Sequence, residues 1–79
     1  TRADIVEYNN GKSIAIEAKL KNMKSVITQA LINTKKYDES WILIPADKEN
    51  IISKHYSFCK MIGVNIILQN KNSYRKIRH

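Results

Sequence analysis

The sequence predicts an α/β domain in which a mixed four-stranded sheet is flanked by helices, and three observations support this fold class. Two short strands of alternating apolar and polar residues meet at Asn10-Gly11, a dipeptide typical of tight hairpin turns. A helical stripe of apolar residues follows, and two nearly continuous apolar runs come later, as expected of strands covered on both faces. A strand, helix, strand order implies a right-handed crossover between parallel strands. We therefore expect a β-hairpin followed by helix, strand, helix and strand.

The hairpin turn determines which residues of the first two strands face each other. With Asn10-Gly11 at the centre of a type I′ turn, counting outward along both strands places Asp4 opposite Glu17. Residues directly opposite each other in an antiparallel pair share a face, with Cβ atoms about 5 Å apart. Lys19 lies two residues beyond Glu17, so the two-residue period of a strand places it on that face as well.

Two facing carboxylates would destabilise a bare hairpin, because like charges repel. A divalent cation such as Mg²⁺ or Mn²⁺ removes this repulsion, since it takes oxygen ligands, often one or two carboxylates together with a substrate phosphate. Such an ion can polarise a phosphoryl oxygen and lower the pKa of a bound water, which Lys19 could hold. The alternative is an ordinary surface hairpin in which Asp4 and Glu17 face each other by chance.

The next two elements are predicted from apolar spacing and from capping residues. A helix is expected over residues 23–36, with Asn22 as its N-cap. Its apolar stripe consists of Val26, Ile27, Ala30, Leu31 and Thr34. Residues 40–45 form an apolar run that ends at Pro45, as expected of a buried strand.

A second helix and a last strand complete the predicted order. Asp47 is the expected N-cap of this helix, and Gly63 is its expected C′ residue. The positions expected to face the core are Ile51, Ile52, His55, Phe58, Cys59 and Ile62. Residues 64–68 are expected to form the last strand, and residues 71–79 a basic C-terminal tail outside a domain that spans residues 1–70.

The composition restricts the classes of partner and compartment. Fourteen Lys and Arg against seven Asp and Glu give the 79-residue chain a formal charge of +7, which points to polyanions such as nucleic acid. The alternative is solvated charge with no binding role. The single Cys59 excludes an internal disulfide and fits a reducing, cytoplasmic compartment. No apolar run is long enough to span a membrane, so no membrane partner is expected.

The residues around Asp4 and Glu17-Ala18-Lys19 resemble the core motif of the PD-(D/E)xK nuclease superfamily. In that motif an Asp near the start of one strand is followed, on the next strand, by (Asp/Glu)-x-Lys. The elements that follow also suit that fold, so the resemblance covers most of the chain. Gln29 resembles the helix glutamine of several of its families, including RecB-like nucleases, and archaeal Holliday-junction resolvases share the same core. Ala3 stands where many members have proline.

The resemblance implies a restriction-endonuclease-like core and Mg²⁺- or Mn²⁺-dependent hydrolysis of phosphodiester bonds, in DNA rather than RNA. Asp4, Glu17 and the Ala18 carbonyl would then bind the metal ion. Lys19 would assist the attacking water, and Gln29 would position the substrate or Lys19.

The superfamily core has a helix and a strand ahead of its Asp-bearing strand, whereas Asp4 is the fourth residue here. We therefore expect either a piece of a longer protein or a sheet completed by a partner, which includes a homodimer. The residues expected to contact nucleic acid are Lys21, Lys24, Lys35, Lys36, Arg75 and Lys76. Two alternatives stay open: a module of this fold that binds nucleic acid without cutting it, and an oligomerisation domain whose charge is incidental.

Overall fold

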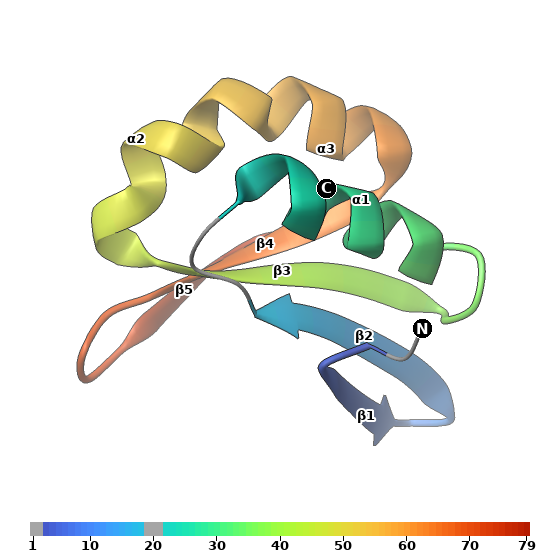
Figure 1. The fold of residues 1–79 in the computed structure, drawn as a ribbon. Coiled ribbons are helices and arrows are strands. Elements are labelled where there is room, and N and C mark those ends of the chain that lie inside the picture. The colour runs from blue at the N-terminus through green and yellow to red at the C-terminus, as the bar shows by residue number, and fades with distance from the viewer. Residues whose placement is uncertain (1–2, 19–21) are drawn as a thin grey trace.

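In the computed structural model, which describes residues 3–18 and 22–79, the strands lie side by side in one mixed sheet (Figure 1). Their order in the sheet follows their order in the chain. The strands are β1 (Ile5–Asn9), β2 (Lys12–Ala18), β3 (Glu39–Pro45), β4 (Val64–Gln69) and β5 (Tyr74–Ile77). The three inner strands are parallel to one another, and each edge strand is antiparallel to its neighbour. The predicted α/β class and mixed sheet are therefore confirmed.

The helices lie over a single face of this sheet (Figure 1). Helix α1 (Met23–Asn33) connects β2 to β3, and it begins at the predicted N-cap, where the Asn22 side chain accepts a hydrogen bond from the Ser25 amide. The second connection consists of four short pieces. They are η1 (Ala46–Lys48), α2 (Glu49–Ile52), η2 (Ser53–His55) and α3 (Tyr56–Ile62), where η denotes a 3₁₀-helix.

The interrupted second connection corrects the predicted core-facing positions. Ile51 and Phe58 were expected to be buried but are 45% and 43% exposed. A 3₁₀ turn has about 3.0 residues where an α-turn has 3.6, so each 3₁₀ piece rotates the following residues around the helix axis. Ile52 and Cys59, which were also among the expected positions, face the core, and both are fully buried. Burial raises the pKa of the Cys59 thiol, in keeping with the predicted role as a small core residue.

The core fills the space between the helices and the face of the sheet that they cover. Its buried apolar residues are Val26, Ile27, Ala30, Ile42, Ile44, Ile52, Cys59, Val64, Ile66 and Leu68. The members from β3 and β4 recur at every second residue, as the strand period requires. Gly63 ends α3 with φ +78°, which is the left-handed conformation predicted for the C′ glycine.

A fifth strand replaces part of the predicted C-terminal tail and corrects the expected count of four. β5 pairs antiparallel with β4, from Tyr74 opposite Gln69 to Ile77 opposite Ile66. Ile77 packs against the core, which accounts for the docking of this segment. Its charged residues gave the appearance of a solvated tail, yet charged side chains are common on edge strands because they prevent pairing with other chains.

No helix formed by the described residues is long and apolar enough to cross a membrane.

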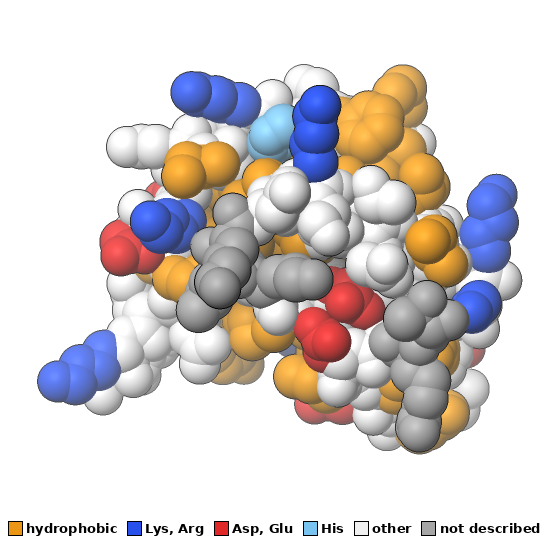
Figure 2. All heavy atoms as spheres, viewed as in Figure 1, with side chains coloured by type: hydrophobic (Ala, Val, Ile, Leu, Met, Phe, Trp, Pro, Cys, Tyr) orange, Lys and Arg blue, Asp and Glu red, His pale blue; other side chains and the backbone are white. Residues whose placement is uncertain are grey.

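Lys and Arg side chains are spread around the rim of the molecular face seen in Figure 2, and a pair of acidic side chains lies near its middle.

Candidate active site

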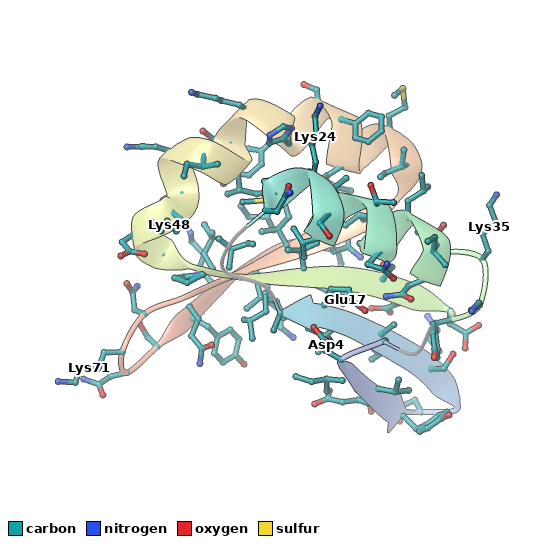
Figure 3. All side chains as sticks on the ribbon, viewed as in Figure 1. Asp4, Glu17, Lys24, Lys35, Lys48 and Lys71 are labelled. Carbon is teal, nitrogen blue, oxygen red and sulfur yellow. The ribbon has the colours of Figure 1, made fainter. Side chains whose placement is uncertain are left out.

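The β1–β2 hairpin adopts the register that the sequence predicts. Asn10-Gly11 forms the turn with φ angles of +53° and +78°, as a type I′ turn requires. Pairing then runs outward from the turn as far as Ile5 opposite Ile16. Asp4 and Glu17 therefore meet at the open end of the hairpin, under α1 (Figure 3).

The two acidic residues are joined by reciprocal hydrogen bonds. The Asp4 amide donates to Glu17 Oε2 over 3.3 Å, and the Ala18 amide donates to Asp4 Oδ2 over 3.1 Å. Each carboxylate thus accepts from the backbone of the other strand, and these bonds hold both acid groups at the same end of the hairpin.

Asn33, in the last turn of α1, provides a further donor that the sequence analysis did not identify. Its Nδ2 donates to Glu17 Oε2 over 3.0 Å, and its side chain is only 1% exposed. A signal for it existed in the sequence. Val26, Ala30 and Asn33 follow one another at intervals of four and three residues, so Asn33 continues the core-facing stripe. A polar residue at such a position requires a buried hydrogen-bond partner, and Glu17 is that partner.

The two carboxylates differ in their exposure to solvent. Glu17 is 4% exposed and lies beneath α1, whereas Asp4 is exposed. Acidic side chains are visible side by side in Figure 2 at the place where Figure 3 labels Asp4 and Glu17. The site therefore combines a buried, rigidly held carboxylate with one that solvent and a ligand can reach.

The donor chemistry of this pair fits a hard divalent cation. The bonds described above occupy one oxygen of each carboxylate, Glu17 Oε2 and Asp4 Oδ2. Mg²⁺ is commonly bound in proteins by one or two carboxylates, with water and substrate phosphate as its remaining ligands. Within residues 3–18 and 22–79, no three His, Cys, Asp or Glu side chains are grouped closely enough to form a metal cage. The site consequently offers a partial set of ligands.

The roles of three predicted catalytic and binding residues, Lys19, Lys21 and Gln29, are not tested by the structure. Lys19 and Lys21 lie outside the described residues. Gln29 is half-buried on α1, one helical turn before Asn33. Among the described residues it is Asn33 that donates to Glu17, so the role of Gln29 stays a prediction.

The predicted nucleic-acid-binding lysines near α1 lie at its two ends. Lys24 is in the first turn, and Lys35 and Lys36 are in the turn that follows the helix. Figure 3 shows Lys24 above the Asp4 and Glu17 pair and Lys35 to the right of it. These lysines form a discontinuous rim around the helix that covers the site.

Arg75 and Lys76 belong to a different part of the molecule, because β5 lies at the sheet edge opposite to β1. Arg75 forms an ion pair with Glu49, on the helix side of the sheet. Lys76 points to the other side, where its Nζ lies 5.6 Å from the centre of the Trp41 ring. The predicted basic residues that the structure describes are therefore not gathered into one patch.

Comparisons of the chain with family models, with curated proteins and with solved structures find no match.

Proposed function

We propose that this chain is a metal-dependent nuclease domain that hydrolyses phosphodiester bonds, with DNA as the expected substrate. The main observation in support is that Asp4 lies beside Glu17 at the end of the hairpin, where Asn33 donates a hydrogen bond to the buried Glu17 carboxylate. The order of hairpin, helix and parallel strand supports a restriction-endonuclease-like core, which forms part of the proposal. The resemblance of Asp4 and Glu17-Ala18-Lys19 to the PD-(D/E)xK motif supports the same assignment.

In this proposal each residue has a separate task. Asp4 and Glu17 hold Mg²⁺ or Mn²⁺ through carboxylate oxygens, and the Ala18 carbonyl adds a ligand. When bound, the ion supplies Lewis-acid polarisation of the phosphate and lowers the pKa of a coordinated water. Lys19 holds the water or neutralises charge that develops on the phosphate. Gln29 orients the substrate or Lys19 from the covering helix.

The charge of the chain supports a polyanionic substrate. Its net charge is +7, and Lys24, Lys35 and Lys36 stand at the ends of the helix above the carboxylate pair. Contacts between lysines and phosphates release condensed counterions, so they contribute affinity without sequence preference. We expect these residues to hold the backbone of the nucleic acid while Asp4 and Glu17 provide the chemistry.

A cleavage assay with Mg²⁺ or Mn²⁺ on duplex and single-stranded DNA tests the proposal. Asp4→Asn and Glu17→Gln keep the size of each side chain but remove its charge, and Lys19→Ala removes the amine. Each should lower the cleavage rate at least about a hundredfold, as expected when a metal ligand or a proton-handling group is lost. Asp47→Asn is the matched control, because Asp47 is an exposed acid on η1. Cleavage by Glu17→Gln at the rate of the unmodified chain would contradict the proposal.

The net charge also favours a second candidate, a module that binds nucleic acid without cutting it. The two candidates predict different results when binding and cleavage are measured in parallel at several salt concentrations, with EDTA as a control. Steeply salt-dependent binding with no product in the presence of metal ions would establish the binding module. Cleavage that EDTA abolishes would establish the nuclease.

A further inference from the structure

No helix formed by the described residues covers the sheet face opposite α1 and α3 (Figure 1). Its central strands β2, β3 and β4 are parallel to one another. Parallel strands are normally covered on both faces, and their sequences are then apolar at successive positions. β3 follows this pattern, because Ile42 and Ile44 face the helices while Trp41 and Leu43 face the other side. The sequence of β3 is therefore suited to a second covering layer.

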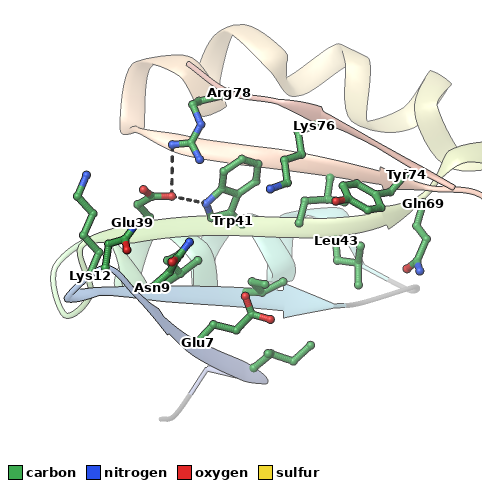
Figure 4. Close-up of a pocket in the computed structure, with 15 residues that line it drawn as sticks. Glu7, Asn9, Lys12, Glu39, Trp41, Leu43, Gln69, Tyr74, Lys76 and Arg78 are labelled. Atoms are coloured by element: carbon green, nitrogen blue, oxygen red, sulfur yellow. Dashed lines mark hydrogen bonds and ion pairs between the residues drawn. The ribbon is translucent and has the colours of Figure 1, made fainter.

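This uncovered surface, termed the open face, is a shallow hollow with an apolar floor (Figure 4). The hollow has a volume of about 640 Å³ and draws residues from all five strands. The aliphatic residues of its floor are Ile5, Ile14, Ile16, Leu43 and Ile67. Ile5 is 40% exposed, and Leu43 and Ile67 are half-buried. Covering these side chains would remove further apolar surface from water.

Trp41 occupies the middle of the open face and is already enclosed by polar neighbours. The Arg78 guanidinium lies 4.8 Å from the centre of the Trp41 ring, and the Lys76 Nζ also lies over this ring. Trp41 is only 2% exposed. The indole N–H donates to Glu39 Oε1 over 2.9 Å, and Arg78 pairs with the same carboxylate (Figure 4). Cations thus cover the aromatic ring on which a nucleic-acid base would stack. The exposed floor is aliphatic, which favours a polypeptide occupant.

Charge is unevenly distributed across the open face. Glu7 lies on β1 at one edge, with Lys12 on the neighbouring β2, whereas Lys76 and Arg78 lie at the β5 edge, and Arg78 also pairs with Glu39 of β3. A two-fold axis parallel to the strands, passing near β3, would turn β1 of one copy over β5 of another. Each Glu7 would then approach the cationic β5 edge of the other copy, so these two contacts would each join opposite charges.

We propose that a second copy of this chain packs against the open face, giving a two-fold symmetric dimer with the two sheets face to face. Aligned sheets pack about 10 Å apart, and five strands spaced about 4.8 Å give a face about 24 Å wide. With strands about 20 Å long, the footprint is about 480 Å², which is the size of a small, weak interface, since a standard interface buries about 800 Å² per partner. The proposal does not depend on the proposed function, because Asp4 and Glu17 lie on the helix side of the sheet.

Sedimentation velocity over a range of chain concentrations tests the dimer. The measurement should be made at about 0.15 M ionic strength. The Debye length is then about 8 Å, so the repulsion between chains of charge +7 is reduced. The sedimenting mass should rise from 9.2 kDa to about twice that value. Ile5→Asp should raise the dissociation constant at least about tenfold. Met61→Asp is the matched control on α3, where Met61 is 73% exposed, and it should leave the dissociation constant unchanged.

A charge exchange tests the predicted orientation. Glu7→Lys and Arg78→Glu, each studied alone, should each raise the dissociation constant of the dimer about tenfold. Each substitution places like charges opposite one another, and two-fold symmetry repeats that contact. An equimolar mixture of the two variants should associate about as strongly as the unmodified chain, since each new contact then joins opposite charges. Circular dichroism of each variant establishes that it is folded.

Three results would overturn the dimer proposal. The first is that the chain is a monomer at every concentration. The second is that Ile5→Asp and Met61→Asp raise the dissociation constant equally. The third is that the mixture of Glu7→Lys and Arg78→Glu associates no better than either variant alone. A monomer whose binding to single-stranded DNA is lost in Lys76→Glu would assign the open face to nucleic acid instead. Glu17→Gln should dimerise normally, so failure of the dimer and failure of the nuclease activity can be told apart.

Discussion

Glu17 is a carboxylate that the fold has taken almost completely out of water, at 4% exposure. Such a group needs donors, because an ionised carboxylate without partners is very unfavourable in an apolar environment. Asn33 Nδ2 and the Asp4 amide both donate to its Oε2, so α1 and β1 both contribute to its position. We regard Asn33 as the positioning residue of the site, since it acts through Glu17.

Asn33→Ala should lower the free energy of unfolding by about 1–3 kcal/mol, the usual cost of leaving a buried polar group without its partner. Gln29→Ala, one turn earlier on the same helix, is the matched control and should change stability by less, because Gln29 is only half-buried. Urea denaturation followed by circular dichroism measures both. Equal effects of the two substitutions would show that Glu17 does not depend on Asn33.

Glu39 provides a pH-dependent contribution to stability. The Trp41 indole N–H donates to its carboxylate and, with the nearby Arg78 guanidinium, holds the pKa of Glu39 below its ordinary value of 4.5. Because the folded state binds this proton less readily than the unfolded state, the stabilisation is present above pH 4.5. It is lost as the pH falls through the lower pKa of the folded state.

Glu39→Gln should therefore be less stable than the unmodified chain at pH 7, and the difference should shrink as the pH falls below 4.5. Thermal unfolding of both proteins over a series of pH values measures this difference. A difference that stays constant down to acid pH would contradict the assignment of the shift to Glu39.

At the scale of elements, the β1–β2 hairpin determines whether Asp4 and Glu17 meet. Gly11 adopts φ +78°, and a Cβ built there would have no neighbour within 4 Å. Any cost of Gly11→Ala is therefore a backbone cost, for which about 1 kcal/mol is expected. Asn10→Gly is the control at the other turn position, φ +53°, and should change stability by only a few tenths of that amount. Chemical denaturation that shows no loss for Gly11→Ala would contradict the type I′ turn.

The hairpin register could be predicted because a local turn and a two-residue alternation specify it together. The same holds for the Asn22 cap and for Gly63, since both depend on residues adjacent in sequence. Asn33 was missed because its partner, Glu17, lies 16 residues away. The helical stripe places Asn33 on the core-facing side but does not indicate which residue it bonds. The 3₁₀ interruptions of the second connection were missed for a related reason. Tertiary packing, rather than local spacing, selects Ile52 over Ile51.

At the scale of the whole molecule, the fold separates two surfaces. The helix side carries the carboxylate pair, with α1 and its lysines above it, and the other side carries the apolar open face. Sequence alone indicated that the strands were suited to burial on two faces. It could not indicate that both connections would pass over the same face, because the hand of a crossover is fixed and the face it covers therefore depends on the order of the strands in the sheet. Docking of β5 likewise involves contacts between residues distant in sequence, among them the packing of Ile77 against the core.

The central claim, that Asp4 and Glu17 bind a divalent cation, is tested most directly by titrating the ¹⁵N-labelled chain with Mn²⁺ and recording its amide NMR signals. Paramagnetic broadening should appear first at Asp4, Glu17, Ala18 and Asn33, and Glu17→Gln should abolish it at the same Mn²⁺ concentration. Signals of the β4–β5 hairpin should stay sharp in both proteins. Broadening that is centred elsewhere, or that is unchanged in Glu17→Gln, would contradict the account.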